Sequence, residues 1–180
     1  MNADIARRVE EIALDLASTL SVVDTPGEVE IAEKVYRIFS EMSYYKANPQ
    51  NLFYVDVPND PLKRKSVIAI LEGKKAKSDK TVLMIGHTDS VGISDYGNLK
   101  EYAHQPLKLT EKFRELDLPQ AVKADLESGE YLFGRGLFDM KSGDAVIMAI
   151  MEMISEDIDH FEGNLVFAAV CDEEGNSAGM

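Results

Sequence analysis

The sequence is poor in cysteine, in histidine and in long apolar runs. Its 180 residues include one cysteine, three histidines and no tryptophan. Because a lone cysteine cannot form an internal disulfide and Cys171 lies in an apolar run, we expect a buried, unreactive thiol. The apolar runs at 145–151 and 165–171 are far shorter than the roughly 20 residues of a membrane-spanning helix. The sequence therefore predicts a protein without a membrane partner.

Basic residues are scarce as well. Nineteen Lys and Arg stand against 32 Asp and Glu, which gives a formal net charge of -13. Such a charge repels nucleic-acid phosphates and anionic lipids, so no nucleic-acid partner is expected. It also attracts metal cations or a basic substrate, although a solvated acidic surface explains the same charge. The first sixteen residues mix acids with Ala and Leu and lack a signal-peptide pattern, which favours a cytoplasmic location.

Length and apolar periodicity predict one α/β domain. A composition of 45% apolar and 28% charged residues is that of an ordinary globular protein. Helical spacing predicts a surface helix at 4–20 that covers the sheet, and an internal helix at 142–154. Another helix is expected after Thr25, with Thr25 as cap, Pro26 as first helical residue and Glu28 completing a capping box.

Four apolar segments have strand character, and the third, TVLMI, is expected to be buried on both faces. They predict a doubly wound, mostly parallel sheet with helices on both faces, of the zinc-exopeptidase type, in which ligands bind at the carboxyl ends of the strands. A polar stretch at 94–129 is expected to form a surface excursion with short helices at 110–116 and 119–126. The predicted strands are residues 52–57, 66–71, 81–85 and 165–171.

Three polar clusters each follow an apolar strand or a glycine-rich turn: GHTDS at 86–90, GRGLFDMKSG at 134–143 and DEEGNSAG at 172–179. Alone, each has an ordinary structural explanation. Together, at the ends of neighbouring parallel strands, they would converge on one crevice with nitrogen and oxygen ligands suited to zinc. The second cluster superficially resembles a phosphate-binding loop, but Met140 stands where glycine is needed and Asp139 would repel phosphate.

These clusters resemble those of the co-catalytic zinc hydrolases that include acetylornithine deacetylase, succinyl-diaminopimelate desuccinylase, aminoacylase and carboxypeptidase G. The resemblance extends over roughly residues 5–180. The phrases HTDSVG, ESGEYLFGRGLFDMKSG and CDEEGNSAGM are most similar to the arginine-utilisation branch of that family. The resemblance implies a metallopeptidase or deacylase that hydrolyses amide bonds in peptides or N-acyl amino acids, in amino-acid or arginine catabolism.

The resemblance also implies a role for each polar residue of the clusters. His87, Asp139 and Glu174 would be ligands of two divalent metal ions, zinc in the first place, with cobalt and manganese as alternatives. Asp139 would bridge the ions, and the peptide bond after it would be cis. Asp89 would orient the His87 ring by accepting its second N–H, and Glu173 would be the general base. In an extended backbone Glu173 and Glu174 would point in opposite directions.

The same resemblance bears on domain organisation. The family's metal pair takes further ligands that this sequence does not supply, so residues 1–180 are expected to be the N-terminal portion of the catalytic domain. The rest of that domain and a dimerisation or lid domain would be absent. By itself this portion is expected to be inactive and to bind metal weakly. A homodimer is one expected assembly of the full-length protein. A non-enzymatic binding or scaffolding relative is the alternative, although a scaffold has no need of a general base such as Glu173.

Overall fold

Four strands form one sheet in the order β1-β2-β4-β3. In this computed structural model, which describes residues 3–180, β1 pairs antiparallel with β2, β2 antiparallel with β4, and only β3 and β4 are parallel. The α/β class is confirmed, but the expected mostly parallel arrangement is wrong for these strands. A short connection joins β1 to β2, and short connections favour antiparallel neighbours. The strands are β1 (Leu52–Asp56), β2 (Lys65–Glu72), β3 (Thr81–His87) and β4 (Asn164–Val170).

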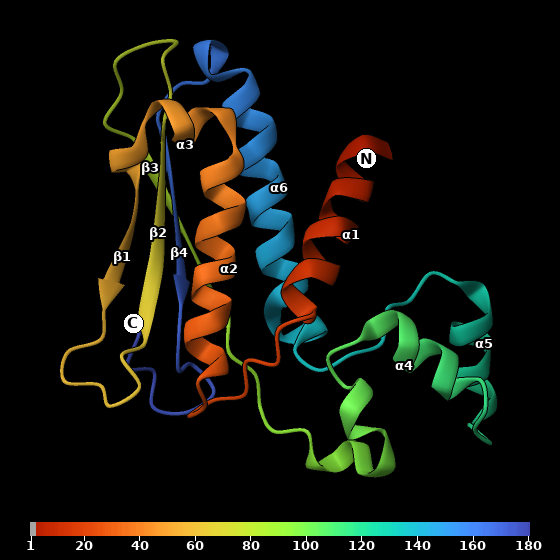
Figure 1. Cartoon of the computed structure of the whole chain (residues 1–180). Helices are drawn as coiled ribbons and strands as arrows, with labels where there is room; N and C mark the ends of the chain where they lie inside the picture. The colour runs from red at the N-terminus through yellow and green to blue at the C-terminus, as the bar shows by residue number, and fades with distance from the viewer. Residues whose placement is uncertain (1–2) are drawn as a thin grey trace.

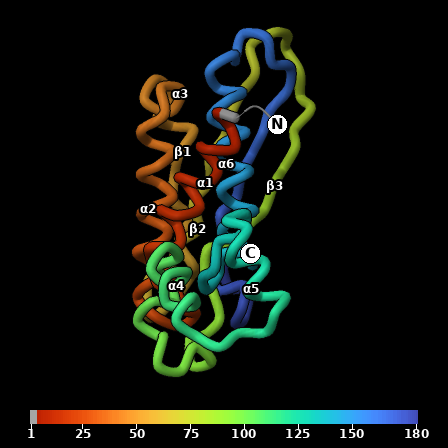
Figure 2. Tube along the Cα trace, turned by 90° about the vertical axis from the view of Figure 1, so that its right-hand side faces the viewer, coloured from red at the N-terminus to blue at the C-terminus, as the bar shows by residue number. Residues whose placement is uncertain are grey.

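Helices cover one face of this sheet (Figure 1). Helices α2 and α6 contact the strands, whereas α1 packs mainly on α6, so the first helix covers the sheet through α6 rather than directly (Figure 2). The core between them includes the fully buried Phe39, Met148 and Phe167. Short helices complete the layer. The helices are α1 (Ala3–Ala17), α2 (Gly27–Glu41), α3 (Ser43–Ala47), η1 (Pro49–Asn51), α6 (Ser142–Glu156) and η4 (Ile158–His160).

The opposite face of the sheet is apolar and open over the described residues 3–180. Val55 on β1 and Leu83 and Ile85 on β3 are 48%, 58% and 51% exposed. The expectations of helices on both faces and of a third strand buried on both faces are therefore wrong for this part of the chain. The physical reason is that β1 and β3 are both edge strands with a strand neighbour on one side only, and the helices of the described chain lie on the other face of the sheet (Figure 1).

The segment between β3 and α6 forms the expected surface excursion. It lies at the end of the sheet where β3 and β4 end (Figure 1). Its two helices are confirmed, and the first begins earlier than expected because Pro106 is at its first position, where proline is favoured. None of the helices within residues 3–180 is both long and apolar enough to span a bilayer. The elements are η2 (Ser94–Tyr102), α4 (Pro106–Phe113) and α5 (Gln120–Ser128).

Candidate metal centre

Parallel pairing of β3 and β4 sets the position of the polar clusters. His87 is the last residue of β3 and pairs with Val170, the last residue of β4. The segments that follow these two strands, at 88–90 and 171–179, therefore leave the same edge of the sheet. The third cluster reaches this edge through η3 (Leu137–Lys141). Its preceding turn contains Gly136 at φ 72, a left-handed conformation that glycine adopts without strain.

The structure brings one residue from each polar cluster together. His87 Nε2 lies 2.9 Å from Asp139 Oδ1 and 3.8 Å from Glu173 Oε2. Ligand atoms of His87, Asp139 and Glu174 all lie within 4.8 Å of one another, and we call these three residues the open cluster. The His87 side chain is 6% exposed and that of Asp139 is 71% exposed, so the cluster faces outward from a buried base. The Asp139–Met140 peptide bond is cis, as the resemblance implies.

Asp89 is placed differently from the expectation that its carboxylate accepts the second imidazole N–H. Asp89 Oδ1 is 3.6 Å from His87 Nδ1, longer than a hydrogen bond, while the Asp89 backbone oxygen is at 3.2 Å. The buried carboxylate instead accepts the backbone N–H groups of Glu173 at 3.1 Å and Glu174 at 2.9 Å. Asp89 thus ties the segment after β3 to the segment after β4.

The backbone at Glu173 and Glu174 is a turn and not the extended segment that was expected. The N–H groups of Gly175 and Ser177 both donate to the Asp172 carbonyl oxygen, and Asp172 itself has φ 62. We call residues 172–178 the acidic turn. Because the turn reverses the chain, the side chains of Glu173 and Glu174 both reach the neighbourhood of His87, and alternation along a strand does not separate them.

Charge accumulates at the open cluster. The neighbouring Asp89 side chain, against the effect of burial and aided by Asp139, raises the pKa of His87 to about 9. Burial and the negative charge of Asp139 raise the pKa of Glu174. Burial opposes ionisation of Asp89, but His87 and the two N–H groups of the acidic turn outweigh it and lower its pKa. A site that favours a proton in this way also favours another cation. One imidazole nitrogen and several carboxylate oxygens are the donors that zinc takes, so the residues present fit a metal ion.

A second acidic cluster, which the sequence did not reveal, lies behind the acidic turn. Arg64 Nη1 lies 2.7 Å from Asp172 Oδ1, 3.1 Å from Glu28 Oε2 and 3.4 Å from Asp24 Oδ1. Arg64 Nη2 lies 2.8 Å from Asp60 Oδ1. The side chains of Glu28 and Asp172 are 0% exposed and that of Arg64 is 7% exposed. We call these five residues the filled cluster, because a guanidinium occupies its centre.

Glu28 therefore has a role other than the capping box that its spacing predicts. Its carboxylate accepts the backbone N–H of Asp24 at 2.8 Å and that of Asp172 at 2.8 Å, and α2 has no side-chain cap. The Thr25 hydroxyl donates to the Val22 carbonyl oxygen instead. Burial raises the pKa of Glu28, although the Asp24 N–H and Arg64 oppose it. No local spacing distinguishes a capping glutamate from one that reaches a distant arginine.

Two further ionisable side chains are buried near the open cluster, and they were not identified from the sequence. Lys141 is 1% exposed and donates to the Thr19 carbonyl oxygen at 2.8 Å, and burial lowers its pKa to about 8. Asp144 is fully buried with no hydrogen-bond partner for either carboxylate oxygen, and burial raises its pKa to about 8. A Cβ at Gly86 would lie 1.9 Å from Asp144 Oδ1, so this carboxylate fits only over a glycine.

A cavity of about 330 Å³ opens beside the open cluster. Phe138 stands at this cavity with 97% of its surface exposed, directly before Asp139 in sequence. Arg135, also at the cavity, pairs with Asp95 of the surface excursion and lies over the Tyr96 ring. An apolar and a charged group therefore accompany the candidate ligands. The cavity is lined by Ser90, Val91, Gly134, Arg135, Gly136, Phe138, Asp139 and Glu174.

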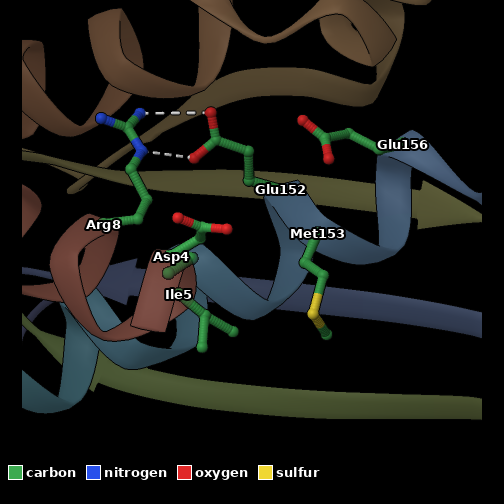
Figure 3. Close-up of a pocket in the computed structure, with 7 residues that line it drawn as sticks. Asp4, Ile5, Arg8, Glu152, Met153 and Glu156 are labelled. Carbon is green, nitrogen blue, oxygen red and sulfur yellow. Dashed lines mark hydrogen bonds and ion pairs between the residues drawn. The ribbon is translucent and has the colours of Figure 1, made fainter. Parts of the chain in front are cut away.

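A groove of similar size, about 340 Å³, lies between α1 and α6 (Figure 3). Its main polar feature is a two-pronged ion pair in which Arg8 Nε lies 2.6 Å and Arg8 Nη2 lies 3.2 Å from the Glu152 carboxylate. It contains none of the open cluster, so we do not place the reaction there. The remaining histidines lie outside the open cluster: His160 is exposed and pairs with Asp157, and His104 is partly buried. Cys171 is buried, as expected.

Comparison with known proteins agrees with this site. Residues 83–180, which include all of the open cluster, match the model of Peptidase family M20/M25/M40. The chain belongs to this family of metallopeptidase-like proteins. It is 39% identical over 175 residues to Protein RocB of Bacillus subtilis, a match that covers 97% of this chain and 31% of RocB.

Solved structures show the same fold at low sequence identity. The di-peptidase Dug1p of Saccharomyces cerevisiae superposes with a TM-score of 0.66 at 16% identity, over 97% of this chain and 34% of Dug1p. The YxeP protein of Bacillus subtilis, described as a dinuclear metal binding peptidase from the M20 family, superposes with a TM-score of 0.50 at 16% identity, over 96% of this chain and 37% of YxeP. The chain spans about a third of the length of the curated relatives it matches.

Proposed function

We propose that this protein is a metal-dependent hydrolase of amide bonds in peptides or N-acyl amino acids. The observation that carries the proposal is the open cluster. Three ligand atoms from three separate segments lie within 4.8 Å of one another at the carboxyl ends of two parallel strands, in a chain of the M20/M25/M40 family. The descriptions of Dug1p as a di-peptidase and of YxeP as a dinuclear metal binding peptidase support it.

His87, Asp139 and Glu174 would hold two divalent metal ions, with zinc as the first choice and cobalt or manganese as alternatives. Bound there, the ions would supply an activated water and polarise the substrate carbonyl. Asp139, the most exposed of the three, would serve as the ligand shared by both ions. The Asp89 backbone oxygen, 3.2 Å from His87 Nδ1, would fix the orientation of the imidazole.

Glu173 would act as the general base of the reaction. Its carboxylate lies 3.8 Å from His87 Nε2, so it borders the open cluster, and it is 38% exposed, so water and substrate can reach it. The carboxylate would take a proton from the attacking water and deliver it to the leaving nitrogen. The Asp89 carboxylate holds the Glu173 backbone N–H, and this fixes where the side chain begins.

The test is an assay of the protein expressed from its native gene, loaded with zinc, cobalt or manganese, on N-acyl amino acids and dipeptides. Glu173→Gln is compared with the wild-type protein and with Glu130→Gln, an exposed glutamate outside the site. We expect Glu173→Gln to lose about 100-fold or more of the rate, as removal of a general base does, and Glu130→Gln to keep it. Equal rates in all three proteins would refute the mechanism, and no activity in any of them would favour a scaffolding role. The arginine-utilisation role, the domain boundary and the homodimer stay predictions.

A further inference from the structure

The acidic turn is anchored by the residue that precedes its two glutamates. Asp172 is fully buried, and its Oδ1 lies 2.7 Å from Arg64 Nη1. Its Oδ2 accepts the backbone N–H of Ala178 at 3.1 Å, and its own backbone N–H donates to Glu28 Oε1 at 2.8 Å. Both ends of the turn thus meet at the Asp172 side chain, whose negative charge is compensated by Arg64.

We propose that Arg64 is a positioning residue for the metal centre. Its guanidinium is a built-in cation that fixes Asp172, and through Asp172 it fixes the backbone on which Glu173 and Glu174 stand. The roles of those two glutamates rest on the proposed function, whereas the contacts that hold them do not.

The geometry of the filled cluster explains why an arginine stands there. Ligand atoms of Asp24, Glu28 and Asp172 lie within 4.8 Å of one another, as those of the open cluster do. Arg64 Nη1 contacts all three carboxylates, while Arg64 Nε and Nη2 lie 3.1 Å and 2.8 Å from the Asp60 carboxylate. A guanidinium can bind one carboxylate through two of its nitrogens while the third nitrogen binds others, which the single nitrogen of a lysine ammonium cannot do.

Asp89 and Arg64 restrain different atoms of the acidic turn. Asp89 holds the N–H groups of Glu173 and Glu174 from the side of the open cluster. Arg64 holds the Asp172 carboxylate. If Arg64 is lost, the Asp172 carboxylate stays buried beside Glu28 without a cation, and like charges at that distance repel each other. Asp172 would then move, and the first residue of the turn would move with it.

The experiment compares Arg64→Ala, Arg64→Lys and a control, Arg37→Ala, with the wild-type protein. Arg37 is also an ion-paired arginine, but its side chain is 51% exposed and its partner Asp15 lies away from the turn. Two properties are measured: zinc affinity by calorimetry, and amide hydrogen exchange of the peptide 172–180 by mass spectrometry. Both are repeated with added ethylguanidinium, which can refill the space left in Arg64→Ala, and with ethylammonium as the ionic control.

We expect Arg64→Ala to bind zinc about 10- to 100-fold more weakly, the usual effect of losing a group that supports metal ligands, and to exchange faster in 172–178. Ethylguanidinium should reverse both changes, ethylammonium neither, and Arg64→Lys should fall in between. Arg37→Ala should match the wild-type protein.

Unchanged zinc affinity and exchange in Arg64→Ala would overturn the proposal. It would also be overturned if ethylguanidinium restored the melting temperature but not zinc affinity, because Arg64 would then serve stability alone. Should Arg64→Ala fail to fold, wild-type affinity and exchange in Arg64→Lys would overturn it. If the wild-type protein bound no zinc, the proposed function would fail, and hydrogen exchange alone would decide the role of Arg64.

Discussion

The open cluster and the filled cluster each include one residue of the acidic turn, Glu174 in the first and Asp172 in the second. Each brings ligand atoms of three residues within 4.8 Å of one another. In the filled cluster, Arg64 supplies a permanent cation, and two of the four carboxylates, those of Glu28 and Asp172, are fully buried. In the open cluster no basic side chain of the described residues pairs with Asp139 or Glu174 other than the His87 imidazole, and Asp139 is 71% exposed. This difference agrees with the two proposals, a metal site at the open cluster and a support for the backbone at the filled cluster.

Metal removal should separate the two clusters most clearly. After treatment with a chelator, activity on amide substrates should fall to background, and zinc, cobalt or manganese should restore it. Zinc at 100 times its dissociation constant should add about 2.7 kcal/mol to the free energy of unfolding, because it binds only the folded protein. Unfolding in urea with and without zinc measures this. Full activity after exhaustive chelation would remove the basis for assigning a metal to the open cluster.

Metal removal should have the largest effect on activity, and loss of the permanent cation should have the largest effect on stability. Arg64→Ala leaves the buried carboxylates of Glu28 and Asp172 without a cation, and breaking a buried ion pair in this way costs about 3–5 kcal/mol. The free energy of unfolding from urea titrations, with zinc absent, gives the value directly. A loss below about 1 kcal/mol would mean that the filled cluster behaves like a surface ion pair, and the contrast between the clusters would not hold.

Asp144 offers a third comparison, since it is buried near the open cluster but has no partner. Its pKa in the folded protein is about 8, raised by burial from the ordinary value of 3.8. The folded protein therefore keeps a proton that the unfolded chain releases, and the free energy of unfolding should fall as pH rises from about 4 to about 8, by up to roughly 1.4 kcal/mol per pH unit.

Asp144→Asn removes this titration. The variant should be more stable than the wild-type protein at pH 8, and the gain should shrink toward pH 5. The measurement is made after chelation, because a bound cation would favour the charged form of Asp144. A gain that is the same at pH 5 and pH 8 would show that Asp144 does not titrate in this range.

The smallest effect is expected where an ion pair faces solvent. Arg37 Nη2 lies 3.0 Å from Asp15 Oδ2, but about half of the arginine side chain is exposed. Solvent screens such a pair, so Arg37→Ala should change the free energy of unfolding by about 0–1 kcal/mol. The same urea titration measures it beside Arg64→Ala. A change as large as that of Arg64→Ala would show that burial is not what distinguishes the filled cluster.

Much of the fold was visible in the sequence. All four strands and the three long helices were predicted, with ends shifted by a few residues, because apolar periodicity is a local property. The convergence of the polar clusters was also predicted, because two of them directly follow apolar strands. In the structure these strands, β3 and β4, are parallel neighbours that end at His87 and Val170. The predicted arrangement of the strands in the sheet was wrong. The antiparallel pairing of β2 and the exposure of Leu83 depend on which strands become neighbours, and a run such as TVLMI looks the same in an edge strand and in a central one.

The candidate metal ligands could be predicted from the sequence, as a histidine and carboxylates directly after apolar strands in a pattern that resembles one family. How those residues are held could be seen only in the folded structure. Arg64 and Asp172 are 108 positions apart, and Glu28 and Asp172 are 144 apart, so neither contact has a local signature. The physical reason is that a buried charge is stable only where folding brings a partner to it, and the sequence lists charges without showing which of them meet.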